Sequence, residues 1–106
     1  MNKNTLLSVA NKIVETINVP EWGEVKLRRL SFAEIDKFNS FQSSPVDGFA
    51  WLVICAVCDE DGKKIFSEED AEQIKSLPAE IVYPIGQAVA ARIGVTFDKL
   101  EESKKN

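Results

Sequence analysis

The sequence contains no histidine, only two cysteines and a single methionine among its 106 residues. Without histidine there is no Ser-His-Asp triad, no Cys-His nucleophile pair and no zinc site with a histidine ligand. The side chain that most often transfers protons near neutral pH is therefore missing. We expect the protein not to be an enzyme and to carry no catalytic residues. The composition favours a binding or assembly module.

Long apolar runs and an excess of basic residues are also missing. No stretch approaches the 18 apolar residues that indicate a membrane-spanning helix, and the first residues do not resemble a signal peptide. Thirteen Lys and Arg stand against 17 Asp and Glu, which gives a formal net charge of −4. A chain of this charge is poorly suited to a phosphate backbone. We therefore expect neither a nucleic acid nor a membrane as partner.

The cysteines and the acidic run that follows them resemble metal motifs only superficially. Cys55 and Cys58 lie in an apolar run, and one CxxC pair without histidine cannot complete a tetrahedral site, so we expect reduced core thiols. The run from Asp59 to Gly62 has the wrong register for a calcium loop, because it would place Val57 at the first ligand position. The sequence thus predicts no metal site and no cofactor.

The order of the patterns predicts a single α+β domain over residues 1–106, mostly α, with an N-terminal β-hairpin at about 14–30. Polar and apolar residues alternate over 24–28, after a loop that contains proline and glycine. A capping box from Ser31 to Glu34 begins a helix that we expect to reach about residue 43. Further helices are expected at about 47–58 with Asp47 as cap, 67–77 and 79–93. A short C-terminal helix is expected at about 96–103, and residues 5–13 could form one or two helical turns.

Four residues are candidates for binding a partner. Trp22 lies in the hairpin loop, where it either covers the small core or projects as an interface anchor. Lys26 and Arg28 face the same way on the second strand of the hairpin, although a solvated charged face is an alternative reading. Phe41 lies at the end of its expected helix, where its ring could lie outside the core.

Two segments together resemble phage tail assembly chaperones of the long, non-contractile-tailed type. Residues 14–38, VETINVPEWGEVKLRRLSFAEIDKF, resemble the family's strand, V-P-E-W-G-like turn, basic-apolar strand and Leu-Ser/Thr-x-x-Glu helix start. Residues 57–70, VCDEDGKKIFSEED, resemble its D-E-D-G-x-x-x-F-S/T-x-x-D segment, and they follow an apolar helix as in the family.

The resemblance implies a non-enzymatic protein of the host cytoplasm that is made during virion morphogenesis and is absent from the finished particle. It implies that the chain binds the tape measure protein, keeps it soluble and helps to recruit tail tube subunits. Self-association into a homo-oligomer through the open edge of the hairpin is a further expectation. The alternative is a structural component of the virion, such as a head-tail connector or a tail completion protein.

Overall fold

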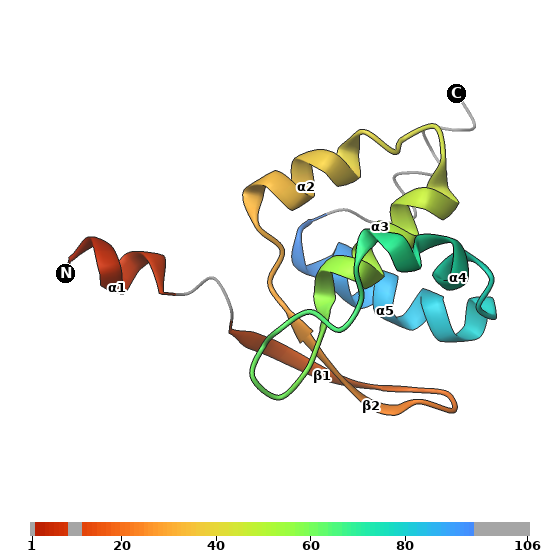
Figure 1. Cartoon of the computed structure of the whole chain (residues 1–106), viewed down its shortest axis with the longest axis horizontal. Helices are drawn as coiled ribbons and strands as arrows, with labels where there is room; N and C mark the ends of the chain where they lie inside the picture. Colours follow the sequence, from red (N-terminus) through yellow and green to blue (C-terminus); the bar gives the residue numbers. More distant parts are fainter. Residues whose placement is uncertain (1, 9–11, 95–106) are drawn as a thin grey trace.

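A small antiparallel sheet lies against a set of helices in the computed structural model, which describes residues 2–8 and 12–94. The chain runs α1 (Lys3–Leu7), β1 (Ile13–Val19), β2 (Gly23–Arg28), α2 (Phe32–Asn39), α3 (Pro45–Ala56) and β3 (Val57–Cys58). A 3₁₀ turn (Glu68–Asp70), α4 (Ala71–Lys75) and α5 (Ala79–Arg92) follow. Figure 1 shows the helices gathered on one side of the hairpin, with α1 set apart from them. The predicted α+β class, mostly α with an N-terminal hairpin, is confirmed.

The hairpin forms because its loop has the residues of a tight turn. The backbone N–H of Trp22 donates to the carbonyl of Val19 at 3.1 Å, and Pro20 occupies the second position of the turn. Glu21 follows with φ of 68°, which the third position of a type II turn requires. β2 then alternates buried and half-buried residues, as the sequence pattern predicts.

The sheet has a third strand that the sequence patterns did not indicate. Strand order is β1-β2-β3, and Val57 and Cys58 pair antiparallel with Leu27 and Lys26 of β2. These two residues were expected to end the helix at 47–58, so that part of the prediction is wrong. Both are buried, and a short run of buried apolar residues fits the strand pattern as well as the helix pattern.

Other helix boundaries also differ from the expected ones. The helix expected at 31–43 ends at Asn39, and the one expected at 67–77 is divided into the 3₁₀ turn and α4. Ser44 rather than Asp47 is the N-cap of α3, with Pro45 at its first position; the Asp47 carboxylate accepts a hydrogen bond from the Ser44 hydroxyl. The helix expected at 96–103 lies outside the described residues.

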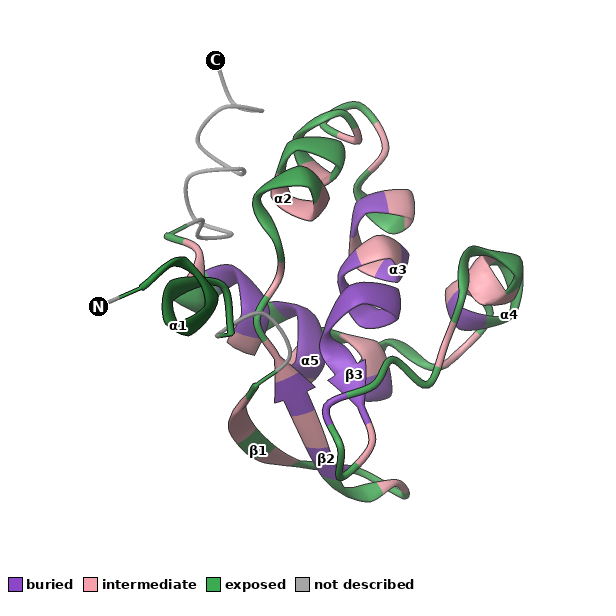
Figure 2. Ribbon diagram, turned by 60° about the vertical axis from the view of Figure 1, so that its left-hand side comes forward, coloured by how far each residue is buried: buried purple, intermediate pink, exposed green. Residues whose placement is uncertain are grey.

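The core is built around α3, which is buried on most sides (Figure 2). Its residues pack against α5 and the inner face of the sheet; the most buried side chains include Leu27, Leu52, Ile74 and Ile85. In contrast, neither α1 nor α2 contains a buried residue. Among the described residues, no helix is long and apolar enough to span a bilayer.

Candidate partner-binding groove

An apolar groove lies between the start of α3, the end of α4 and the start of α5. It encloses a hollow of about 190 Å³. Its walls include Val46, Phe49, Ile74, Leu77, Val82 and Tyr83. We call this feature the α3–α5 groove. Pockets lined mainly by apolar and aromatic side chains are the usual seats of apolar ligands and partner side chains.

The groove combines a buried floor with an exposed rim. Ile74 at its floor is buried, whereas Val46 and Tyr83 at its rim are 59% and 51% exposed. The Tyr83 ring packs edge-on against the ring of Phe49, with 5.3 Å between the ring centroids. Exposing two large apolar side chains to water beside a hollow has a free-energy cost, which a partner's apolar side chain would offset.

Charge at the groove is predominantly acidic. Lys75 is the charged residue among those lining it, and its ammonium group forms ion pairs with Asp47 at 2.8 Å and Glu72 at 2.7 Å. The hydrogen bonds to Asp47 and Glu72 raise the pKa of Lys75. The hydrogen bond from Lys75 and that from the Ser44 hydroxyl lower the pKa of Asp47. The Asp47 carboxylate therefore remains ionised at neutral pH, and together with Glu72 there are two carboxylates beside the single lysine.

Glu80, in the first turn of α5, adds a further exposed carboxylate between the lining residues Ala79 and Val82. Asp47 and Glu72 against one lysine leave a local excess of negative charge beside an apolar surface. This arrangement suits an apolar segment that is flanked by basic residues.

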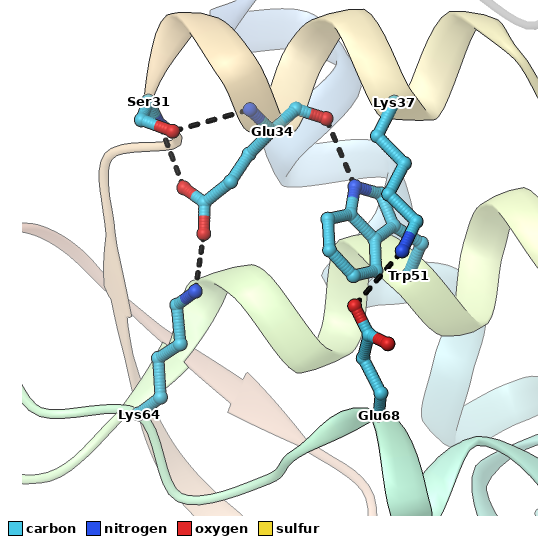
Figure 3. A network of polar contacts seen from close by, with 6 residues as sticks. All are labelled: Ser31, Glu34, Lys37, Trp51, Lys64 and Glu68. Atoms are coloured by element: carbon cyan, nitrogen blue, oxygen red, sulfur yellow. Dashed lines mark hydrogen bonds and ion pairs between the residues drawn. The ribbon is translucent and has the colours of Figure 1, made fainter.

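A set of polar contacts joins α2 to α3 and to the segment that follows β3 (Figure 3). The Glu34 side chain accepts a hydrogen bond from the backbone N–H of Ser31 at 2.7 Å and forms an ion pair with Lys64. The Trp51 indole N–H donates to the Glu34 carbonyl at 2.9 Å. The helix start therefore carries the capping box that the sequence predicts.

These polar contacts continue across the face of the Trp51 ring. The Lys37 ammonium group lies 4.3 Å from the ring centroid and forms an ion pair with Glu68 at 2.8 Å. A cation over a tryptophan face is attractive because the π cloud is negative. Trp51 thus joins three segments: α2, α3 and the 3₁₀ turn.

Glu34 is held as a carboxylate by these contacts. Burial alone would raise its pKa, but the hydrogen bonds from Lys64 and from the Ser31 N–H lower it more, so its pKa lies below the ordinary value of 4.5. The pKa of Glu68 is also lowered, by the hydrogen bond from Lys37. At neutral pH the Glu34 and Glu68 carboxylates are therefore ionised.

The sequence-predicted binding residues lie outside the α3–α5 groove. Trp22 and Lys26 line a second hollow, of about 340 Å³, between the hairpin and the loop after β3. The Trp22 ring is half-buried, packs against the core and lies 6.2 Å from the ring of Phe66. Arg28 lies two residues further along the same face of β2 as Lys26, as the alternation of buried and half-buried residues shows.

Phe41 lies elsewhere again, because α2 has already ended when the chain reaches it. Its half-buried ring lies 6.4 Å from the Trp51 ring and lines a third hollow with Lys37 and Glu68. The structure thus brings Trp22 and Lys26 together and separates both from Phe41. A partner-binding role for these four residues stays a prediction.

Sequence reasoning missed the groove residues Val46 and Tyr83. Both are apolar residues that stand off the main stripe of their helix: Val46 follows the first proline of α3, and Tyr83 is outside the stripe of Val82, Ile85 and Val89. Their position outside the apolar stripes of their helices was the signal that could have marked them as binding residues. Which two helix starts would meet could not be read from spacing alone.

The two cysteines belong to the core, as predicted. Cys55 and Cys58 are both free thiols and both buried. Burial, together with the negative charge of Glu34, raises the pKa of Cys55 to about 12, and burial raises the pKa of Cys58. Among the described residues, no group of three or more His, Cys, Asp or Glu side chains could hold a metal ion.

The fold is similar to that of the tail assembly chaperone of bacteriophage HK97. The two structures superpose with a TM-score of 0.65 and 22% sequence identity, over 86% of this chain and 99% of that chain. No family model matches the chain, and no curated protein matches it either. At this level of identity the likeness concerns the fold, over nearly its whole extent.

Proposed function

We propose that this protein is a phage tail assembly chaperone that binds the tape measure protein, keeps it soluble and helps to recruit tail tube subunits. The observation that carries the proposal is an open apolar groove with an acidic rim, on a fold similar to that of a tail assembly chaperone. The residues of segments 14–38 and 57–70 support it independently, since they resemble that family.

The physical basis is the covering of apolar helix surface. A long helical client that has not yet assembled exposes apolar stripes, and such stripes dock into apolar grooves through residues at helical spacing. A hollow of about 190 Å³ receives one or two client side chains, so each contact is weak. Many copies along one client gain strength through repetition. The net charge of −4 keeps the covered client soluble.

This function requires no chemistry, so we propose that the protein is not an enzyme and acts in the host cytoplasm. The alternative, a head-tail connector or tail completion protein, predicts a different location. Mass spectrometry of purified virions distinguishes them: the chaperone is absent from the particle, and a connector is present in stoichiometric amounts. Finding the chain in mature particles contradicts the proposal.

Co-expression with the tape measure protein tests the groove. The Val46→Glu variant places a charge on the rim, where the side chain is 59% exposed, so the fold should be retained. We expect the soluble fraction of the client to fall towards its level without chaperone. The matched control is Phe32→Glu, because Phe32 is apolar, 91% exposed and in α2, outside the groove. Equal client solubility with both variants would show that the client does not bind in the groove.

A further inference from the structure

The N-terminal helix α1 is exposed along its whole length. None of its residues is buried, and its two leucines, Leu6 and Leu7, are 57% and 66% exposed. It is nevertheless capped locally: the Asn2 side chain accepts hydrogen bonds from the backbone N–H and the hydroxyl of Thr5 at 2.8 and 2.9 Å. We call α1 with its cap Asn2 the N-terminal arm. The arm thus presents two apolar side chains, consecutive in the sequence, on a short helix.

A helix of five residues does not hold its shape in water by itself. Isolated helices shorter than about 12–15 residues are marginal even with good helix-forming residues. Capping adds only about 1 kcal/mol. Leu6 and Leu7 are the large apolar residues of the helix, so they are the side chains through which a partner surface would stabilise it.

The α3–α5 groove has the size and charge to be that surface. A cavity of about 150 Å³ can hold a benzene molecule, so the hollow of about 190 Å³ accepts a leucine side chain. Lys3 precedes Leu7 by four residues, which places both on one face of α1. Its ammonium group would then approach the carboxylates of Asp47 and Glu72 beside the groove.

The arm cannot reach the groove of its own chain. Residues Ser8 to Lys12 separate α1 from β1, and from Leu7 to Ile13 the chain spans at most about 20 Å when fully extended. Figures 1 and 2 both show α3 and α5 between the start of β1 and α4, at whose side the groove opens. The connection would have to pass around α3 and α5, which lie between β1 and the groove. The occupant must therefore be the arm of another copy.

We infer that α1 of one copy docks through Leu6 and Leu7 into the α3–α5 groove of a second copy. A reciprocal exchange of arms closes the contact as a two-fold dimer. The arm is then an internal substitute for the client: it covers the apolar groove until a client helix displaces it. This contact stands apart from client binding, since it forms in the client-free protein.

A synthetic peptide of residues 2–12 tests the contact directly. It is added to the full-length Leu6→Ser/Leu7→Ser variant, which we call the arm variant. This variant has an intact groove but lacks the two leucines that would dock, and the backbone NMR signals of the protein are followed. We expect saturable shifts centred on Val46 and Tyr83. A peptide with serine at both leucine positions is the control and should cause none. Absence of shifts, or shifts centred outside the groove, overturns the inference.

Sedimentation equilibrium over a concentration series provides the second measurement. The average mass of the wild-type protein should rise with concentration. The association constant of the arm variant should fall by at least about tenfold for each leucine removed. The Val46→Glu variant, whose groove carries a charge at its rim, should remain monomeric. The Phe32→Ser variant, changed outside both the arm and the groove, should associate like the wild type. Mixing the arm variant with Val46→Glu restores one of the two contacts, so the mixture associates where neither component does. A wild-type protein that stays monomeric, or an arm variant that associates normally, contradicts the inference.

The client assay separates this inference from the proposed function. Because the groove of the arm variant is vacant, we expect it to solubilise the tape measure protein at least as well as the wild type does. If the client is unaffected by any variant while the peptide still binds, the arm contact holds and the proposed function fails. If the arm variant solubilises the client less well and the peptide causes no NMR shifts, α1 is a client contact and the inference is wrong.

Discussion

A glycine of α5 lies against an aromatic ring of α3, which makes Gly86→Ala an informative substitution. A Cβ atom at Gly86 would lie well within 3.0 Å of two carbon atoms of the Phe49 ring, a separation that real Cβ contacts essentially never show. Because the Phe49 ring is half-buried at the groove wall, it is the group that must move.

Two opposing free-energy changes set the expected size. Overpacking a core contact costs about 1–3 kcal/mol. Alanine is better than glycine within a helix by about 1 kcal/mol, which offsets part of that cost. We expect Gly86→Ala to lower the free energy of unfolding by about 1 kcal/mol and the melting temperature by about 4 °C or more. Urea denaturation and calorimetry measure both quantities.

Gly48→Ala is a matched control within the same core. Gly48 is also a buried helical glycine, but a Cβ there would meet Phe38 at 3.3 Å and Phe41 at 3.5 Å, which small side-chain movements can relieve. The propensity gain is the same, so the difference between the two variants isolates the Phe49 contact. If Gly86→Ala is as stable as Gly48→Ala, the reasoning is refuted.

A double substitution identifies the group responsible. Phe49→Leu removes ring atoms that the new Cβ would meet, so the effects of Gly86→Ala and Phe49→Leu should be less than additive by about 1 kcal/mol. Purely additive effects would mean that the backbone, not the Phe49 ring, absorbs the added methyl group.

Four further outcomes are expected. Glu21→Gly should raise the free energy of unfolding by about 1 kcal/mol in urea titrations, because Glu21 has φ of 68°, a conformation that glycine adopts without strain. Trp51→Phe should lower it by about 1–2 kcal/mol, because it leaves the Glu34 carbonyl without its indole donor. Since the pKa of Glu34 is lowered on folding, its contribution is present above about pH 4.5 and is lost as the pH falls through the lower folded pKa; Glu34→Gln should flatten the acid limb of a stability-against-pH curve. With the pKa of Cys55 at about 12, a thiol reagent at pH 8 should leave Cys55 unmodified in the native protein and modify it in urea; rapid native labelling would contradict the burial.

Local signals predicted the parts of the fold that depend on neighbouring residues. The capping box at Ser31 and Glu34 formed as its spacing indicates, because both hydrogen bonds join residues three apart. The hairpin formed for the same reason, since proline presets the turn at position 20. Gly94 has φ of 82° just after α5, which is where a helix ends most easily on a glycine.

Features that depend on distant residues escaped prediction. Val57 and Cys58 form a strand and not the end of a helix because they pair with the edge of β2. The ten uncharged residues 49–58 contain no local signal that shows where the helix ends and the strand begins. The groove escaped for the same reason: it exists where the starts of α3 and α5 meet, and Val46 and Tyr83 are 37 positions apart in the sequence.

The two walls of the groove differ in how firmly they are held, and this difference bears on what the groove can bind. On the α3–α5 side, the Phe49 ring packs so closely over Gly86 that a Cβ atom at this position would lie within 3.0 Å of it. On the other side, α4 is only five residues long; the buried Ile74 anchors it in the core, and its Lys75 forms a partly exposed ion pair with Asp47. Partly exposed ion pairs contribute little free energy and break readily. Because Lys75 lines the groove, opening of this ion pair would let the groove accept apolar side chains of different size, as the proposed client with many different apolar segments would require. We therefore expect substitutions in α4 to change which client segments are protected, and substitutions at the α3–α5 contact to weaken protection of them all.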